Sequence, residues 1–314
     1  MKSHSGVAPQ WLTLKLKLKL AILAAIAFLS VVTTTAVYAQ KNFSSPEAAM
    51  NALGNAVVKD REDTLRTLFG NDFRELIPPV GAQVRDMFIA EWAKSHTIGP
   101  VEKGRTHIVV GDNGWTFPVP LVKTGQGWHF DTRAGAQEIR LRRIGRNELA
   151  VIQTMLAIYD AQREYAQISH DGDEGVLAYA SRMVSSPGKR DGLYWPAAPG
   201  ETQSPLGEAF VDASSSNAKN AGYYGYHYKL LESQGPHAKG GAYNYVVRGK
   251  LFGGFAVIAW PVKYGDTGIK SFMVSHDGQI YQRDLGPDSA AKAQGTRSFD
   301  PGPGWSKVPD ADVQ

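Results

Sequence analysis

Aromatic side chains are the residues whose types and spacing most clearly suggest a binding site in this chain. Tyr and Trp rings offer a large contact area with a polar tip, so a set of them can line a cleft that binds a glycan. The alternative is ordinary packing, because the same residue types favour half-buried strands. The candidate ligand contacts are Tyr194, Trp195, Tyr224, Tyr226, Trp260 and Tyr264.

A cluster of arginines is the second candidate site. Arg142, Arg143 and Arg146 lie within five residues of one another. Their charges can bind an anion or form ion pairs between the two halves of the chain, and a solvated linker is the alternative. We name them as candidate anion or interdomain contacts.

Signals for catalysis are weaker. His129 and Asp131 fall on one face of an expected strand, where a His–carboxylate pair could act as a general base, although a solvent-facing edge explains the same alternation. The sequence contains no HExxH, GxSxG, Walker A or dinucleotide-binding motif. The eight His show no metal-ligand spacing and there is no Cys, so we expect no metal site and no cofactor.

The N-terminal segment has the composition of a secretory signal peptide. Four lysines precede an apolar run over residues 20–32, and the small-residue sequence Val37-Tyr38-Ala39 follows it. We expect residues 1–39 to be removed near Ala39, which places the mature chain in the periplasm or outside the cell. Retention of the segment as an anchor helix is the alternative.

Removing this segment changes the charge balance. The full chain has 34 Lys and Arg against 30 Asp and Glu, and the four lysines of residues 1–39 account for the difference. A mature chain of net charge near zero has no bulk attraction to nucleic acid, so we expect no nucleic-acid partner. Contact with a membrane is expected only through the signal segment before cleavage.

The elements that must position the candidate residues are helices and antiparallel strands. Residues 146–168 predict one amphipathic helix, with Asn147 as its N-cap and Leu149, Ile152, Leu156 and Tyr159 on its apolar face. Before it, residues 42–140 predict helices followed by strands. After it, apolar runs predict an antiparallel sheet that covers the helix, with a hairpin at Asp277-Gly278.

These patterns predict an α+β protein of two lobes, each with a helix packed on an antiparallel sheet. The lobes are residues 42–140 and 141–286. Residues 287–314 have no clear periodicity and are expected to form an irregular C-terminal tail.

Several strings of the second half resemble a known family. RRIGRNELAVIQTMLAIYDAQREYA, DGLYWP, GYYGYHYKLLESQGPHAKGGAYNYVV and GGFAVIAWPVKYGDTGIKSFMVSHDGQIYQRDLG are similar to the bacterial domain-of-unknown-function family twenty-nine-fifty, whose members are exported proteins without an assigned activity. The resemblance spans about residues 43–286. The resemblance implies membership of this family and export of the chain, and it does not imply a particular reaction.

Each half also resembles a wider group of domains. SPEAAMNALGNAVVKDREDTLRTLFG and VPLVKTGQGWHFDT are similar to cystatin-like and nuclear-transport-factor-two-like domains. Ala161-Gln162, Gly225-Tyr226 and Asp277-Gly278 belong to a pattern similar to pilin and pseudopilin-like domains. In pilins the helix continues an N-terminal membrane segment, whereas here it lies in mid-chain, so the resemblance does not imply filament assembly.

The function expected from the sequence is that of a non-enzymatic binding or scaffold protein of the envelope, with another envelope protein or a glycan as its partner. The alternative is a hydrolase that acts on cell-wall or polysaccharide substrates. A shallow aromatic surface favours the first, and a deep cleft with converging carboxylates or a His–Asp pair favours the second.

Overall fold

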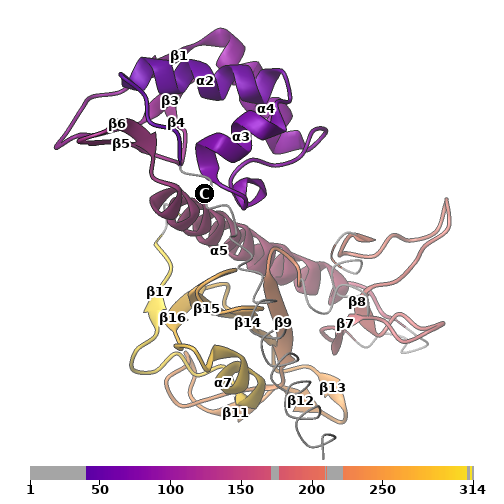
Figure 1. Ribbon diagram of the computed structural model, residues 1–314. Helices are drawn as coiled ribbons and strands as arrows, with labels where there is room; N and C mark the ends of the chain where they lie inside the picture. Colours follow the sequence, from indigo (N-terminus) through magenta and orange to yellow (C-terminus); the bar gives the residue numbers. More distant parts are fainter. Residues whose placement is uncertain (1–39, 171–176, 209, 211–221, 310–311, 313–314) are drawn as a thin grey trace, which may run out of the picture. The chain divides into compact units, whose positions relative to one another are not determined.

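The computed structural model describes residues 40–170, 177–208, 210, 222–309 and 312 (Figure 1). The predicted signal segment, residues 1–39, lies outside them. The described residues form helices and mostly antiparallel sheets, so the predicted α+β class is confirmed. The chain divides into two compact units, one ending at Asp131 and the other beginning at Thr132.

The N-terminal unit begins with helices. Ser45 caps the first of them by accepting a hydrogen bond of 3.2 Å from the Ala48 N–H, and Pro46 takes the first helical position. Buried Leu53, Leu65 and Phe69 place the apolar faces of two helices in one core. The helices are α2 (Pro46–Val58), α3 (Glu62–Phe69), the 3-10 turn η1 (Phe73–Glu75) and α4 (Gln83–Lys94).

Two small antiparallel sheets complete this unit. One has the order β1-β3-β4 and the other β2-β5-β6. Phe130 and Trp128 point from β6 into the core, whereas His129 alternates to the other face. The strands are β1 (His96–Ile98), β2 (Arg105–Thr106), β3 (Ile108–Val110), β4 (Trp115–Thr116), β5 (Leu121–Thr124) and β6 (Gly127–Phe130).

The C-terminal unit is built on one long helix, α5 (Thr132–Tyr165). The prediction that this helix begins at Arg146 with an Asn147 cap is wrong, because the helix starts 14 residues earlier. Residues 132–145 contain good helix formers and no Pro, and Gly135 and Gly145 each cost only about 1 kcal/mol in a helix. Asn147 is therefore interior, and its Nδ2 donates to the Thr267 carbonyl at 2.8 Å.

The buried face of α5 packs on a five-stranded antiparallel sheet of order β17-β16-β15-β14-β9 (Figure 1). Its strands are β9 (Tyr226–Leu231), β14 (Ala256–Pro261), β15 (Lys270–Ser275), β16 (Tyr281–Asp284) and β17 (Ser306–Lys307). Val151, Ile152, Met155 and Ile158 are buried there. Leu149, predicted on the same face, is 50% exposed and points elsewhere.

A second helix, α7 (Ser289–Gly295), packs on the opposite face of this sheet. Val257 and Ala259 of β14 face α5, whereas Ile258 and Trp260 pack in the cluster that contains Ala293 of α7. Strand β14 is buried along its whole length for this reason, and its sequence is a continuous apolar run rather than an alternating one.

The C-terminal segment is more ordered than predicted. Residues 287–314 were expected to be irregular, yet they supply α7 and the edge strand β17, and Phe299 and Val308 are buried. A helix of seven residues and a strand of two carry almost no periodic signal, and their stability comes from contacts with the sheet.

The remaining strands are short pairs outside the main sheet. β7 (Arg182–Val184) and β8 (Gly192–Tyr194) are parallel, whereas β10 (Ser233–Gln234) pairs antiparallel with β11 (Tyr243–Asn244), and β12 (Val246–Val247) with β13 (Lys250–Leu251). The predicted hairpin at Asp277-Gly278 is present, since β15 and β16 pair on either side of it.

Replacing Ile152 with Asp should destabilise the C-terminal unit by more than about 3 kcal/mol, because an unpaired charge would be buried against the sheet. The matched control is Leu149→Asp on the same helix, which should cost less than about 1 kcal/mol since that side chain is half exposed. Urea unfolding of the full chain measures both. Equal stability of the two variants would contradict the assignment of the buried face.

Candidate ligand pocket

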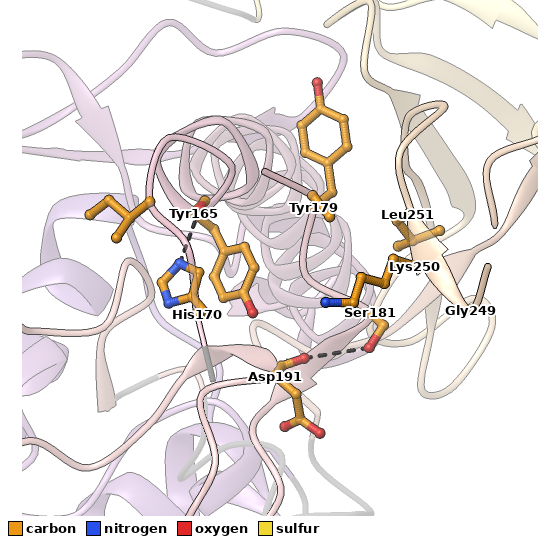
Figure 2. Close-up of a pocket in the computed structure, with 10 residues that line it drawn as sticks. Tyr165, His170, Tyr179, Ser181, Asp191, Gly249, Lys250 and Leu251 are labelled. Atoms are coloured by element: carbon orange, nitrogen blue, oxygen red, sulfur yellow. Dashed lines mark hydrogen bonds between the residues drawn. The ribbon is translucent and has the colours of Figure 1, made fainter. Parts of the chain in front are cut away.

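A pocket of about 190 Å³ lies in the C-terminal unit beside the end of α5 (Figure 2). Three further segments surround it: residues 178–181, the residue that precedes β8, and the hairpin of β12 and β13. The lining residues are Tyr165, Ile168, His170, Ala178, Tyr179, Ser181, Asp191, Gly249, Lys250 and Leu251.

One wall of the pocket is an aromatic stack. The His170 ring stacks on the Tyr165 ring at 3.8 Å between centroids, and the Trp195 ring lies 5.7 Å from the His170 ring and 6.5 Å from the Tyr165 ring. Tyr165 Oη donates to the Arg190 carbonyl at 2.5 Å, and His170 Nε2 lies 3.0 Å from the Tyr165 carbonyl. A carbonyl can only accept, so the His170 proton lies on Nε2, and both rings are held in place.

A buried glutamine fixes the segment opposite this wall. The Gln162 side chain is inaccessible to solvent, donates to the Ala180 carbonyl at 2.9 Å and accepts from the Ala180 N–H at 2.8 Å. The neighbouring Tyr179 N–H donates to the Leu251 carbonyl at 3.0 Å. Residues 178–181 are therefore tied to α5 on one side and to β13 on the other.

The hairpin of β12 and β13 brings a lysine to the pocket. Its two turn residues, Arg248 and Gly249, both have positive φ, which is the backbone of the two-residue turn that matches the twist of paired strands. Lys250 follows the turn, and Figure 2 shows its side chain reaching toward Tyr165.

Asp191 lines the pocket with its backbone rather than with its carboxylate. Its carbonyl accepts from Ser181 Oγ at 3.5 Å, and Figure 2 shows its carboxylate pointing away from His170. That carboxylate accepts from the Ser186 N–H at 2.7 Å and from Ser186 Oγ at 2.8 Å. Partial burial opposes ionisation, but these two bonds and nearby Arg182 outweigh it and lower the pKa of Asp191.

Two of the six predicted ligand contacts lie next to this pocket. Trp195 is buried and supports the His170 ring, and its Nε1 donates to the Thr202 carbonyl at 3.0 Å. Tyr194 is half-buried at the end of β8 and packs against the α5 core.

The other four lie elsewhere in the unit and do not form one cleft. Tyr226 is fully buried on the α5 face of the sheet, whereas Trp260 is buried on the α7 face. Tyr264 donates to Asp284 at 3.2 Å, and Tyr224 is 51% exposed beside Tyr223. Burial raises the pKa of Tyr226, whose hydroxyl donates to the Lys270 carbonyl at 2.8 Å, so this tyrosine is part of the core.

Two arginines of the predicted cluster form ion pairs within the C-terminal unit. Arg143 forms an ion pair with Asp266 in the loop before β15, and Arg142 pairs with Glu138 one turn away at 2.7 Å. Arg146 is exposed on the same helix. Arg143 thus helps to dock α5 on the sheet.

None of the residues that line the pocket was among the predicted ligand contacts, and the missed polar side chains include His170, Ser181 and Lys250. They come from three separate segments, and none stands in a motif. Tyr165 gave the one usable signal, an aromatic residue at the end of the amphipathic helix.

Metal-binding clusters and membrane-spanning helices are both absent from the described part of the chain. No group of three or more metal-ligating side chains occurs among the described residues. Within the same residues, no helix has the length and apolar character needed to cross a membrane.

The family model for proteins of unknown function DUF2950 matches residues 40–308. The chain therefore belongs to this family, and the resemblance inferred from its sequence is confirmed. No curated protein and no solved structure matches the chain. The similarities to cystatin-like, nuclear-transport-factor-two-like and pilin-like domains stay predictions.

Replacing Asp191 with Asn should lower the free energy of unfolding by about 1–2 kcal/mol at pH 7, because a charged acceptor of the Ser186 bonds is lost. The folded pKa is lowered, so this stabilisation is complete above the unfolded value of about 3.9 and is lost as the pH falls through the folded value. The difference between wild type and variant, measured by urea unfolding, should therefore shrink below about pH 4. A difference that stays constant down to pH 2 would contradict this account.

Proposed function

We propose that this chain is an exported envelope protein that binds a glycan, and that the pocket beside the end of α5 is its binding site. The observation that carries the proposal is the fixed stack of His170 on Tyr165 at the edge of a polar pocket. Sugars present apolar C–H faces together with hydroxyls, and such a wall offers ring surface next to hydrogen-bonding groups.

The residues around the stack suit the same ligand. Ser181 and Lys250 provide hydroxyl and ammonium groups that can contact sugar hydroxyls. Ile168 on the rim is 51% exposed, which adds apolar surface beside the opening. The site is preorganised, because Tyr165 and the 178–181 segment are held by hydrogen bonds to buried groups.

The geometry favours binding over hydrolysis. His170, Ser181 and Asp191 are residue types that hydrolases use, and all three line the pocket. A general base must point toward the proton it removes, but the Asp191 carboxylate is bound to Ser186 and points away from His170. The hydrolase that the sequence left as the alternative is therefore the weaker proposal.

The test is titration of the purified mature chain with di-N-acetylchitobiose, a disaccharide of the sugar found in bacterial cell walls. His170→Ala should weaken binding at least about fivefold, because the stacked ring surface is lost. His237→Ala is the matched control, since His237 is an exposed histidine that pairs with Asp300 away from the pocket residues. Absence of saccharide binding to the wild type would refute the proposal, and release of reducing ends would favour the hydrolase.

The export part of the proposal has its own test. Expressed in a bacterium, the chain should appear in the periplasm with Gln40 as its first residue, because Val37 and Ala39 suit signal peptidase. Ala39→Arg should block cleavage and leave the full-length chain in the membrane fraction. Mass spectrometry of the two fractions measures both outcomes, and full-length wild type in the cytoplasm would contradict export.

A further inference from the structure

The size of the pocket limits what it can hold. Sites that enclose a drug-sized ligand have volumes of about 300–1,000 Å³, and this pocket has about 190 Å³. It can take only the end of a chain-like ligand. The rest of such a ligand must lie on the surface next to the opening, and the structure contains a suitable surface there.

Tyr179 connects the pocket to that surface. Its residue lines the pocket, but Figure 2 shows its ring pointing away from Tyr165 and Ser181. The ring packs on Phe255 in an edge-to-face contact at 4.9 Å. Tyr159 of α5 packs on the same Phe255 at 6.1 Å between ring centroids, so both tyrosines contact one buried side chain.

A third tyrosine lies beside these two. Burial raises the pKa of Tyr179, negative charge on Tyr159 or Tyr243 would raise it further, and nearby Arg163 lowers it. Tyr243 contacts Gly253, which lies two residues before the Phe255 that supports Tyr159 and Tyr179. Tyr243 is 38% exposed, and its hydroxyl lies 3.3 Å from the Gly253 carbonyl and from His276 Nε2. The Tyr179 hydroxyl can donate to a ligand, and the Tyr243 oxygen can accept from one.

Arg163 adds a positive charge to the edge of this cluster. It follows Tyr159 by one helical turn, and its guanidinium lies 5.5 Å from the centre of the Tyr159 ring. A guanidinium backed by an aromatic ring binds a carboxylate through paired N–H donors. The exposed acids Asp160 and Glu164 flank Arg163, so a ligand with carboxylates spaced along a chain suits this surface better than a dense polyanion.

We propose that Tyr159, Tyr179, Tyr243 and Arg163, which we call the tyrosine platform, form a second subsite that binds the continuation of an acidic oligosaccharide whose end enters the pocket. This inference rests on the proposed function. It adds a ligand class, a saccharide chain that bears carboxylates, and a length of more than two sugars.

The test compares two tetrasaccharides with the same backbone. One alternates N-acetylglucosamine with N-acetylmuramic acid, and the other, tetra-N-acetylchitotetraose, lacks the carboxylates. Isothermal titration with the full mature chain should give a Kd about tenfold lower for the acidic tetrasaccharide, because one charge-assisted contact is added. Arg163→Gln should remove this preference, whereas Arg140→Gln, an exposed arginine on the same helix, should keep it.

The platform rings are tested separately from the charge. Tyr243→Ala should weaken both tetrasaccharides about fivefold and leave di-N-acetylchitobiose binding unchanged, while Tyr243→Phe retains the ring and most of the affinity. Melting temperatures equal to that of the wild type establish that these surface variants are folded.

The outcomes separate the two proposals. Wild type that binds the disaccharide and both tetrasaccharides equally well, or an Arg163→Gln variant that keeps a preference, overturns the platform and leaves the pocket intact. Wild type that binds none of the three saccharides overturns the glycan-binding proposal and the platform with it.

Discussion

The structure of the C-terminal unit depends on the attachment of α5 to the five-stranded sheet. Burial of the apolar face around Val151, Met155 and Ile158 stabilises the attachment, but the hydrophobic effect is not directional and does not fix the position of the helix. A carboxylate supplies the register: Glu148 accepts from the N–H groups of Ile269 and Lys270 at 2.8 and 2.9 Å. These charge-assisted bonds fix where along the helix the start of β15 is placed.

The same attachment determines the geometry of the pocket. Once α5 is fixed on the sheet, its last turn projects Gln162 and Tyr165 toward segments that have no regular structure of their own. Gln162 holds residue 180 and Tyr165 holds residue 190. The pocket walls are thus loops positioned by a rigid helix, which is a common way to build a binding site.

The sequence predicted what depends on local periodicity and failed where tertiary contacts decide. The apolar spacing identified Ile152 as buried, and the turn residues at Asp277-Gly278 located a hairpin. The start of α5 was misplaced because an arginine-rich stretch without a strong apolar stripe is helical all the same. The order in residues 287–314 was missed because α7 is short and is held by the sheet rather than by its own propensity.

The candidate site also shows that sequence periodicity does not predict which residues tertiary contacts bring together. Aromatic residue type predicted a cleft, but alternation along adjacent strands sends Tyr226 and Trp260 to opposite faces of one sheet, where both are core. The partly or largely exposed rings that do gather come from α5, a loop and β11, separated by up to 84 positions between Tyr159 and Tyr243. No local sequence pattern predicts that residues so far apart in the chain lie close together in the fold. This proximity follows from the placement of α5, because Tyr159 and Tyr179 both pack on Phe255, just before β14 of the sheet on which the helix lies.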